Sequence, residues 1–212
     1  MNVKSKTTIG VISGVALAVV VLAYSVTTVP VGQSSIEQKI PDEQKIVLRP
    51  PPTLVREYGK QINLTQAEAT VPYHIPTIPN PPEGVSLKRV AAGSASKMFV
   101  LLYASGEVSD NADVNEVLFN QKGILVRGDP IPPNITEKES LEAYIAASPE
   151  TRTLISVNGI GAVGVEHDPT IPRPSYIIVY TNQTMYAIAA DMPLADLIKL
   201  AESMNFRPAP KQ

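Results

Sequence analysis

The stretch YIIVYTNQTMYAIAADMPLADLIKLAESMNF covers residues 176–206 and decides the fold, because it holds two strands and then a helix. Apolar runs at 176–180 and 185–190 flank the polar residues 181–184, a pattern that predicts a β-hairpin. The next segment, 193–206, carries apolar residues at helical spacing and is closed by Pro208, with Asp191 as the expected N-cap. The expected buried stripe of this helix is Leu194, Leu197, Ile198 and Ala201.

The sequence before residue 176 contains several predicted strands with few helices between them. Thr136 and Glu139 form a capping box for a helix that stops at Pro149, and Thr65 with Glu68 predicts a short turn that ends before Pro72. The helix capped by Thr136 should bury Leu141, Tyr144, Ile145 and Ser148. Strands are predicted at 85–91, 97–104, 116–120, 124–127, 153–157 and 162–166. Runs of strands with inserted helices indicate an α+β fold, an antiparallel sheet with two main helices packed on one face.

Composition excludes several classes of function. The 212 residues include no cysteine, which excludes disulfides, thiolate zinc sites and thiol nucleophiles. The formal net charge is -2 and no basic stripe is present, so nucleic acid is not an expected partner. The length fits one domain with appendages.

An uncharged segment near the N-terminus predicts a membrane anchor. No charged residue occurs from Thr7 to Ile36, and Ile9–Val29 is dominated by Val, Ala, Leu and Ile. As a helix this core would be about 31 Å long, which matches the hydrocarbon thickness of a bilayer. We expect a transmembrane helix at 9–31.

Flanking charges predict the orientation of this helix. Lys4 and Lys6 precede it, whereas a slightly acidic segment follows. The positive-inside rule therefore places residues 1–8 in the cytoplasm and the rest outside, in a single-pass protein of the cell membrane. A cleaved signal peptide is the alternative, because Ala23-Tyr24-Ser25 has small residues where a signal peptidase reads. Under either interpretation, the domain is translocated across the membrane.

Gly10, Gly14 and Ala18 form a row of small residues along the predicted helix. Such rows let membrane helices approach closely, so lipid and other membrane proteins are the expected partners; Gly and Ala are also simply common in such helices. Residues 32–64 contain Pro41 and Pro50–Pro52 and predict a semi-rigid tether. The folded domain is then expected at 65–207, with a short tail at 208–212.

Only His74 and His167 could supply an imidazole, and neither lies in a recognisable catalytic frame. Glu166, His167 and Asp168 form the most ligand-like tripeptide. Adjacent residues on a strand point to opposite faces, so three ligands would converge on a metal only if Pro169 bends the chain. An exposed loop is the simpler interpretation, and no cofactor is expected.

Two further patterns concern polar loops. Glu107, Asp110, Asp113 and Glu116 are oxygen-rich, but they lack the ligand order of a calcium-binding EF-hand, so a solvated loop is expected. Asn63, Asn134 and Asn182 each begin a sequon for N-glycosylation at a predicted loop or turn.

Several short elements follow one another in order along the chain. These elements are Ala67-Glu68-Ala69, Val71-Pro72-Tyr73, Ile75–Pro79, Pro82-Glu83-Gly84 before a strand, Val157-Asn158-Gly159, the paired Tyr180 and Tyr186, and Leu197–Met204. In this order they resemble a family of extracytoplasmic domains of unknown function. The family often forms the outer C-terminal part of single-pass, anti-sigma-factor-like membrane proteins. The resemblance covers about residues 65–206 and implies a sensory or interaction module with no catalytic residues.

The chain departs from that family at its N-terminus, because about eight cytoplasmic residues are too few to fold into an anti-sigma domain. We therefore expect a membrane-anchored, non-catalytic sensor or interaction module that signals through a partner. An accessory subunit of a larger membrane complex is the alternative. A secreted hydrolase or metal-binding protein is a third class, for which no assembled set of residues is visible.

Overall fold

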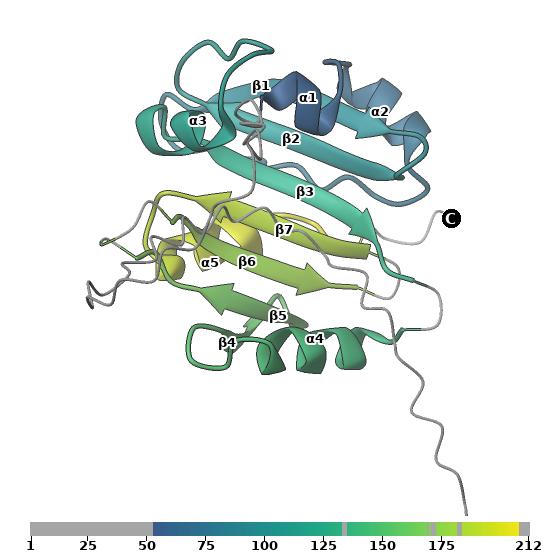
Figure 1. The fold of residues 1–212 in the computed structure, drawn as a ribbon, viewed down its shortest axis with the longest axis vertical. Helices are drawn as coiled ribbons and strands as arrows, with labels where there is room; N and C mark the ends of the chain where they lie inside the picture. The colour runs from purple at the N-terminus through teal and green to yellow at the C-terminus, as the bar shows by residue number, and fades with distance from the viewer. Residues whose placement is uncertain (1–52, 133–134, 169, 171–172, 182–183, 208–212) are drawn as a thin grey trace, which may run out of the picture. The chain divides into compact units, whose positions relative to one another are not determined.

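Seven antiparallel strands form one sheet in the computed structural model, which describes residues 53–132, 135–168, 170, 173–181 and 184–207. The strand order is β1-β2-β3-β7-β6-β5-β4, as Figure 1 shows. The strands are β1 (Ser86–Gly93), β2 (Met98–Ala104), β3 (Ile124–Pro130), β4 (Thr153–Val157), β5 (Ile160–Val165), β6 (Ser175–Tyr180) and β7 (Thr184–Ala190). The chain first builds β1 to β3, crosses to the far edge, and returns through β6 to place β7 beside β3.

The predicted α+β class with an antiparallel sheet is confirmed. The late hairpin pairs β6 with β7 from Tyr180 opposite Met185 to Ser175 opposite Ala190. The turn between β4 and β5 is also confirmed, since Asn158 and Gly159 adopt φ values of 50° and 75°. These are the left-handed conformations that a two-residue hairpin turn requires.

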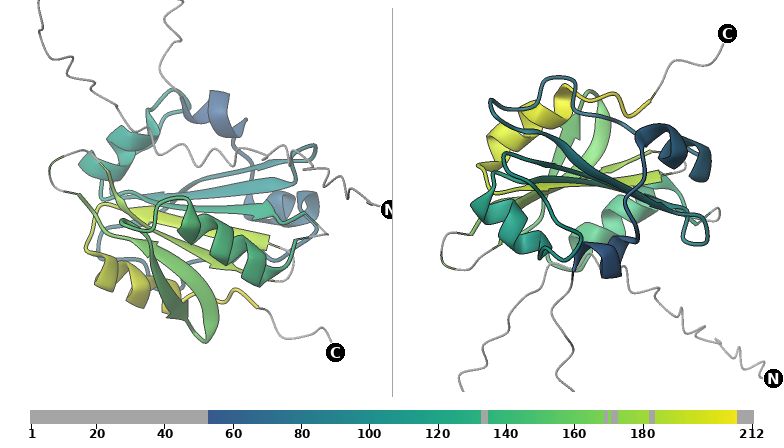
Figure 2. Two further views of the ribbon diagram at one scale, coloured as in Figure 1. Left: turned by 60° about the horizontal axis from the view of Figure 1, so that its bottom comes forward. Right: turned by 90° about the horizontal axis from the view of Figure 1, so that it is seen from above.

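Helices cover both faces of the sheet, so the expectation that they pack on one face was wrong. They are α1 (Leu54–Tyr58), α2 (Leu64–Thr70), α3 (Val114–Asn120), α4 (Glu137–Ala146) and α5 (Leu194–Glu202). Figure 2 shows α2 and α5 on one side of the sheet and α1, α3 and α4 on the other. The physical reason is visible in β6, where all six side chains are buried, because a strand that is apolar on both sides needs cover on both sides.

The segment predicted as a strand at 116–120 is part of helix α3. Asp113 caps this helix by accepting hydrogen bonds from the backbone N–H groups of Asn115 and Glu116, at 2.7 and 3.3 Å. Val114, Val117 and Leu118 then share one buried face. Spacings of three and four residues are the helical period, which outweighed the strand propensity of this short run.

The helix N-termini differ from expectation at two places. Thr136 and Glu139 form the predicted capping box of α4, but the cap of α2 is Asn63 with Gln66 rather than Thr65. Helix α5 begins after Pro193, not at Asp191, and Pro193 has no side chain that could cap it. Its N-terminus is instead satisfied by Glu166, which directly follows β5.

The folded domain begins earlier than the expected boundary at residue 65. Leu54 is fully buried and packs with α3 and β2. The backbone N–H groups of Leu54 and Val55 donate to the carbonyls of Ala112 and Asp110, at 3.1 and 2.9 Å. Residues 53–64, which were assigned to the tether, therefore belong to the domain.

An aromatic cluster forms the centre of the face under α2 and α5. Tyr186 lies among Tyr73, Phe99 and Phe206, with ring centroids 5.4–6.4 Å apart. The Tyr186 hydroxyl donates to the carbonyl of His74 at 2.9 Å, which fixes the proline-rich connection between α2 and β1 against the sheet. The predicted helix stripe is partly confirmed, since Leu197 and Ala201 are fully buried while Leu194 and Ile198 are half-buried.

Helix α4 is covered less than expected. Leu141, Tyr144 and Ile145 do form its inner side, but each is only half-buried, and Ser148 lies beyond the end of the helix. In the part of the chain that the structure describes, no helix is both long and apolar enough to cross a membrane. The predicted transmembrane helix, with Gly10, Gly14 and Ala18, lies outside the described residues.

Candidate functional site

The predicted tripeptide Glu166-His167-Asp168 follows β5 directly, at the end of the sheet where β6 begins and β7 ends. Its three side chains have three separate sets of partners. Across the described residues, no group of three His, Asp or Glu side chains is placed to hold a metal ion. The tripeptide does not converge on one point.

Glu166 satisfies the N-terminus of helix α5. Its Oε1 accepts a hydrogen bond from the backbone N–H of Leu194 at 3.0 Å. The hydroxyl of the fully buried Ser175 lies 3.5 Å from the same oxygen. A carboxylate at a helix N-terminus pairs with an otherwise unsatisfied N–H group and with the helix dipole. Glu166 therefore replaces the cap that Pro193 cannot provide.

His167 forms an imidazole–carboxylate pair with Asp191. Its Nδ1 lies 3.3 Å from Asp191 Oδ1, an ion-pair distance without hydrogen-bond geometry, and both side chains are about one-third exposed. Ser175 Oγ accepts from the backbone N–H of His167 at 2.8 Å. Because this hydroxyl is engaged by the backbone and not by the ring, the residues do not form a serine–histidine nucleophile pair.

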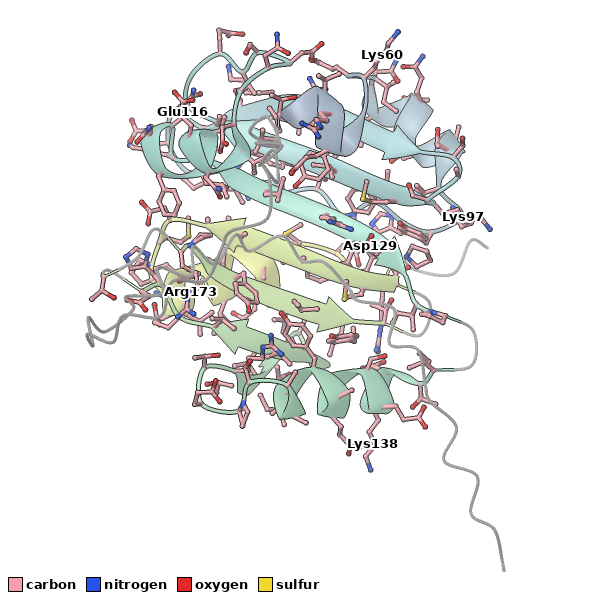
Figure 3. All side chains as sticks on the ribbon, viewed as in Figure 1. Lys60, Lys97, Glu116, Asp129, Lys138 and Arg173 are labelled. Carbon is pink, nitrogen blue, oxygen red and sulfur yellow. The ribbon has the colours of Figure 1, made fainter. Side chains whose placement is uncertain are left out.

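Asp168 stabilises its own loop. Its Oδ1 accepts from the hydroxyl and the backbone N–H of Thr170, at 2.6 and 3.0 Å. These hydrogen bonds, with the nearby Arg173, hold the pKa of the Asp168 carboxyl below its ordinary value. The residue folds the loop between β5 and β6, and Figure 3 shows Arg173 at this end of the molecule.

The acidic loop also has structural partners. Asp113 caps α3, Glu107 lies 3.5 Å from Lys88, and Asp110 pairs with Arg89 of β1. The expectation of a solvated loop is right for Glu107, whose side chain is 99% exposed, and only partly right for Asp110.

Arg89 is the most buried charged side chain that the structure describes, at 1% exposure. Its Nη1 bonds Asp110 Oδ1, and its Nη2 donates to the carbonyl of Gly59 at 2.6 Å. The Nε–H group has no hydrogen-bond partner among the described residues. Arg89 thus links the end of α1, the acidic loop and the sheet, and a buried charge requires such pairing.

A charged pair on β3 was missed by sequence reasoning. Arg127 donates through Nε and Nη2 to the two carboxylate oxygens of Asp129, at 2.7 and 2.8 Å. Both side chains are largely buried, at 26% and 16% exposure. Burial alone would lower the pKa of the Arg127 guanidinium, but the bidentate bond outweighs this effect and raises it.

The surroundings of this pair come from α1. Burial raises the pKa of the Tyr58 hydroxyl to about 12, with Arg127 as a nearby positive charge that opposes the shift. Burial likewise raises the pKa of Glu57. Figure 3 shows Asp129 near the end of β3 that is opposite to Arg173. Because residues two apart on a strand point to the same face, the sequence could have placed Arg127 and Asp129 together. The position of their strand within the sheet, however, is known only from the strand order.

Each of the three polar clusters is therefore paired within the domain. Arg89 with Asp110, Arg127 with Asp129, and Glu166 with Leu194 each direct charge toward a partner within the domain. General acid–base catalysis needs a titratable group aimed at a substrate position, and the imidazole of His167, about one-third exposed, is the group nearest to that description.

Of the three predicted glycosylation asparagines, Asn63 is the one that lies within the described residues. Asn63 is exposed, and its side chain accepts a hydrogen bond from the backbone N–H of Gln66 at 2.8 Å, as the cap of α2. Asn134 and Asn182 lie outside the described residues.

Comparison of the chain with protein-family models, curated proteins and solved structures finds no match. The resemblance to extracytoplasmic domains of unknown function consequently stays a prediction.

Proposed function

We propose that the chain is a membrane-anchored, extracytoplasmic, non-catalytic sensor or protein-interaction module. The observation that carries this proposal is the absence of any charged residue from Thr7 to Ile36, in the part of the sequence that precedes the folded domain. Removing such a segment from water is favourable only if it enters a bilayer or a protein interior. The preceding Lys4 and Lys6 keep the N-terminus inside, so the domain would face outward.

The folded domain supports an interaction role over catalysis. Its charged side chains in the sheet serve as internal links, as Arg127 does with Asp129. The resemblance to outer domains of anti-sigma-factor-like proteins favours the same class.

Protease protection tests the placement. Full-length protein should fractionate with membranes of intact cells, and external protease should digest the domain without cell lysis. A cytosolic soluble product would overturn the proposal, as would a domain that becomes sensitive only after the cells are broken. A tag on the N-terminus should show the reverse pattern of protection.

An accessory subunit of a larger membrane complex is the second candidate, favoured by the row Gly10, Gly14 and Ala18. Replacing Gly10 and Gly14 by Leu should disrupt close helix packing and release the chain from a stoichiometric complex in mild detergent. Ala16→Leu enlarges a small residue that lies off this row and is the control. Unchanged assembly in the Gly10/Gly14 variant would reject this face.

A further inference from the structure

The two edges of the sheet are protected to different degrees. At the β1 edge, the backbone N–H of Ile62 donates to the carbonyl of Val90 at 2.9 Å, and Gln61 Nε2 donates to the carbonyl of Lys88 at 3.4 Å. Within the described part of the chain, no hydrogen bond reaches the outer edge of β4. Proteins usually protect exposed edges with charges, prolines or cover.

Strand β4 lacks these protective features. Its sequence is TLISV, with neither charge nor proline, and Leu154 is 63% exposed. The other exposed large hydrophobic residue of the described chain is Ile135, at 44%, which precedes α4 and is not on a strand. An exposed apolar side chain on an open edge marks a site for strand pairing.

The hairpin geometry shows which backbone groups point outward. Val157 and Ile160 close the two-residue turn and form a hydrogen-bonded pair. Because such pairs alternate along an antiparallel ladder, the N–H and C=O groups of Leu154 and Ser156 point away from β5. At the free edge of β4, the backbone groups of Leu154 and Ser156 can therefore form hydrogen bonds with another strand.

We propose that β4 pairs with β4 of a second copy of this chain, antiparallel about a two-fold axis at Ile155, to form a continuous sheet. Leu154 of one copy then lies opposite Ser156 of the other, and the two residues exchange backbone hydrogen bonds, about four in all. Because β4 carries no charged side chain, pairing it with a second β4 brings no like charges opposite each other within the strand.

A segment of the same chain does not suit this edge. The nearest strand-like stretch outside the described residues is Ile46-Val47-Leu48. Four residues separate Leu48 from Thr53, and the five Cα-to-Cα steps between them span at most about 17 Å. Since Thr53 precedes α1, which packs on β1 and β2, the far edge lies about 24 Å or more away at the usual strand spacing.

Thiol cross-linking of the full-length chain in mild detergent tests the pairing, because the protein has no cysteine of its own. In the proposed dimer the two copies of residue 154 are diagonal neighbours, about 7–8 Å apart. Leu154→Cys should therefore form a covalent dimer with a short bis-thiol reagent, about fivefold more than Ile135→Cys under the same conditions. Both variants keep the N-terminal segment, so association through that segment would affect them equally.

Two further measurements make the test decisive. Adding Ser156→Lys to the Leu154→Cys variant places two lysines close together across the dimer axis, and should reduce the cross-link to the Ile135→Cys level. In the unmodified chain, amide exchange at Leu154 and Ser156 should slow as protein concentration rises. Equal cross-linking at the two positions, or exchange independent of concentration, would overturn the proposal. So would binding of an extended foreign peptide without self-association. None of these outcomes depends on membrane placement, which the protease experiment tests separately.

Discussion

Gly128 of β3 lies directly opposite Phe99 of β2, and the aromatic ring occupies the space that a side chain would need. A Cβ atom at position 128 would be 2.2 Å from Cε1 of that ring. The ring packs against Tyr73 and Tyr186, so it has little freedom to move away. The glycine is required here by close approach and not by an unusual backbone angle.

We therefore expect Gly128→Ala to lower the free energy of unfolding by about 1–3 kcal/mol, because the core is overpacked. Denaturant unfolding of the full chain in detergent can be followed by tyrosine fluorescence, since the chain has no tryptophan. Gly93→Ala is the control, because the atom nearest to its new Cβ belongs to the exposed and rotatable hydroxyl of Ser96. Equal effects of the two substitutions would contradict this account.

At the scale of elements, two glycines of β5 let helices approach the sheet from opposite sides. A Cβ at Gly161 would be 2.7 Å from Leu141 of α4, and a Cβ at Gly164 would be 2.9 Å from Leu194 of α5. Which helix lies over which glycine depends on the crossing connections, and local pattern does not contain that information.

Gly161→Ala should destabilise the protein by about 1 kcal/mol or more, because the methyl group collides with the end of Leu141. Leu141→Val shortens that side chain, so the double variant should lose less stability than the sum of the two single variants. Urea midpoints of the four proteins complete the cycle. Strict additivity would show that α4 does not pack on Gly161.

Helix α3 shows why a short element can be assigned wrongly. Val117-Leu118-Phe119 reads as a strand when it is considered alone, because apolar runs of this length fit either structure. The cap at Asp113 and the burial of Val114 decide for a helix. The cap signal was present in the sequence but was interpreted as part of an acidic loop.

At the scale of the whole molecule, tyrosine burial couples stability to alkaline pH. Burial raises the pKa values of Tyr58, Tyr180 and Tyr186 from the ordinary 10.0 to about 12 each. In the unfolded chain these hydroxyls ionise near pH 10, whereas in the folded protein they stay protonated to higher pH. Their contribution to stability is therefore complete below about pH 10 and is lost as pH rises toward 12.

We expect the free energy of unfolding to fall steeply between about pH 10 and pH 12. Urea unfolding at a series of alkaline pH values measures this fall, and tyrosinate absorbance reports the ionisation. Tyr58→Phe removes one of the three groups, so its stability should decline less over the same range. A decline of the same size in this variant would show that Tyr58 is not involved.

Some features of the candidate site could be predicted from the sequence, and others are visible only in the structure. Residue types and loop positions identified Glu166, His167 and Asp168, and the sequence spacing already argued against a shared metal. Their actual partners, Leu194, Asp191 and Thr170, were not predictable where the contact spans distant segments. Arg127 and Asp129 could be placed on one strand face, but not at the middle of a sheet.

Local features of this protein could be predicted from the order of its residues: most strands, the capped helix α4, much of the stripe of α5, the Asn158-Gly159 turn and the uncharged N-terminal segment. These features follow from hydrophobic period, capping and turn chemistry, which act within a few residues. The folded structure was needed to establish the strand order, the helices on both faces, the burial of Arg89 and the open edge at β4. Those properties arise because segments far apart in the chain compete to cover the same apolar surface, and no short window of sequence records the outcome.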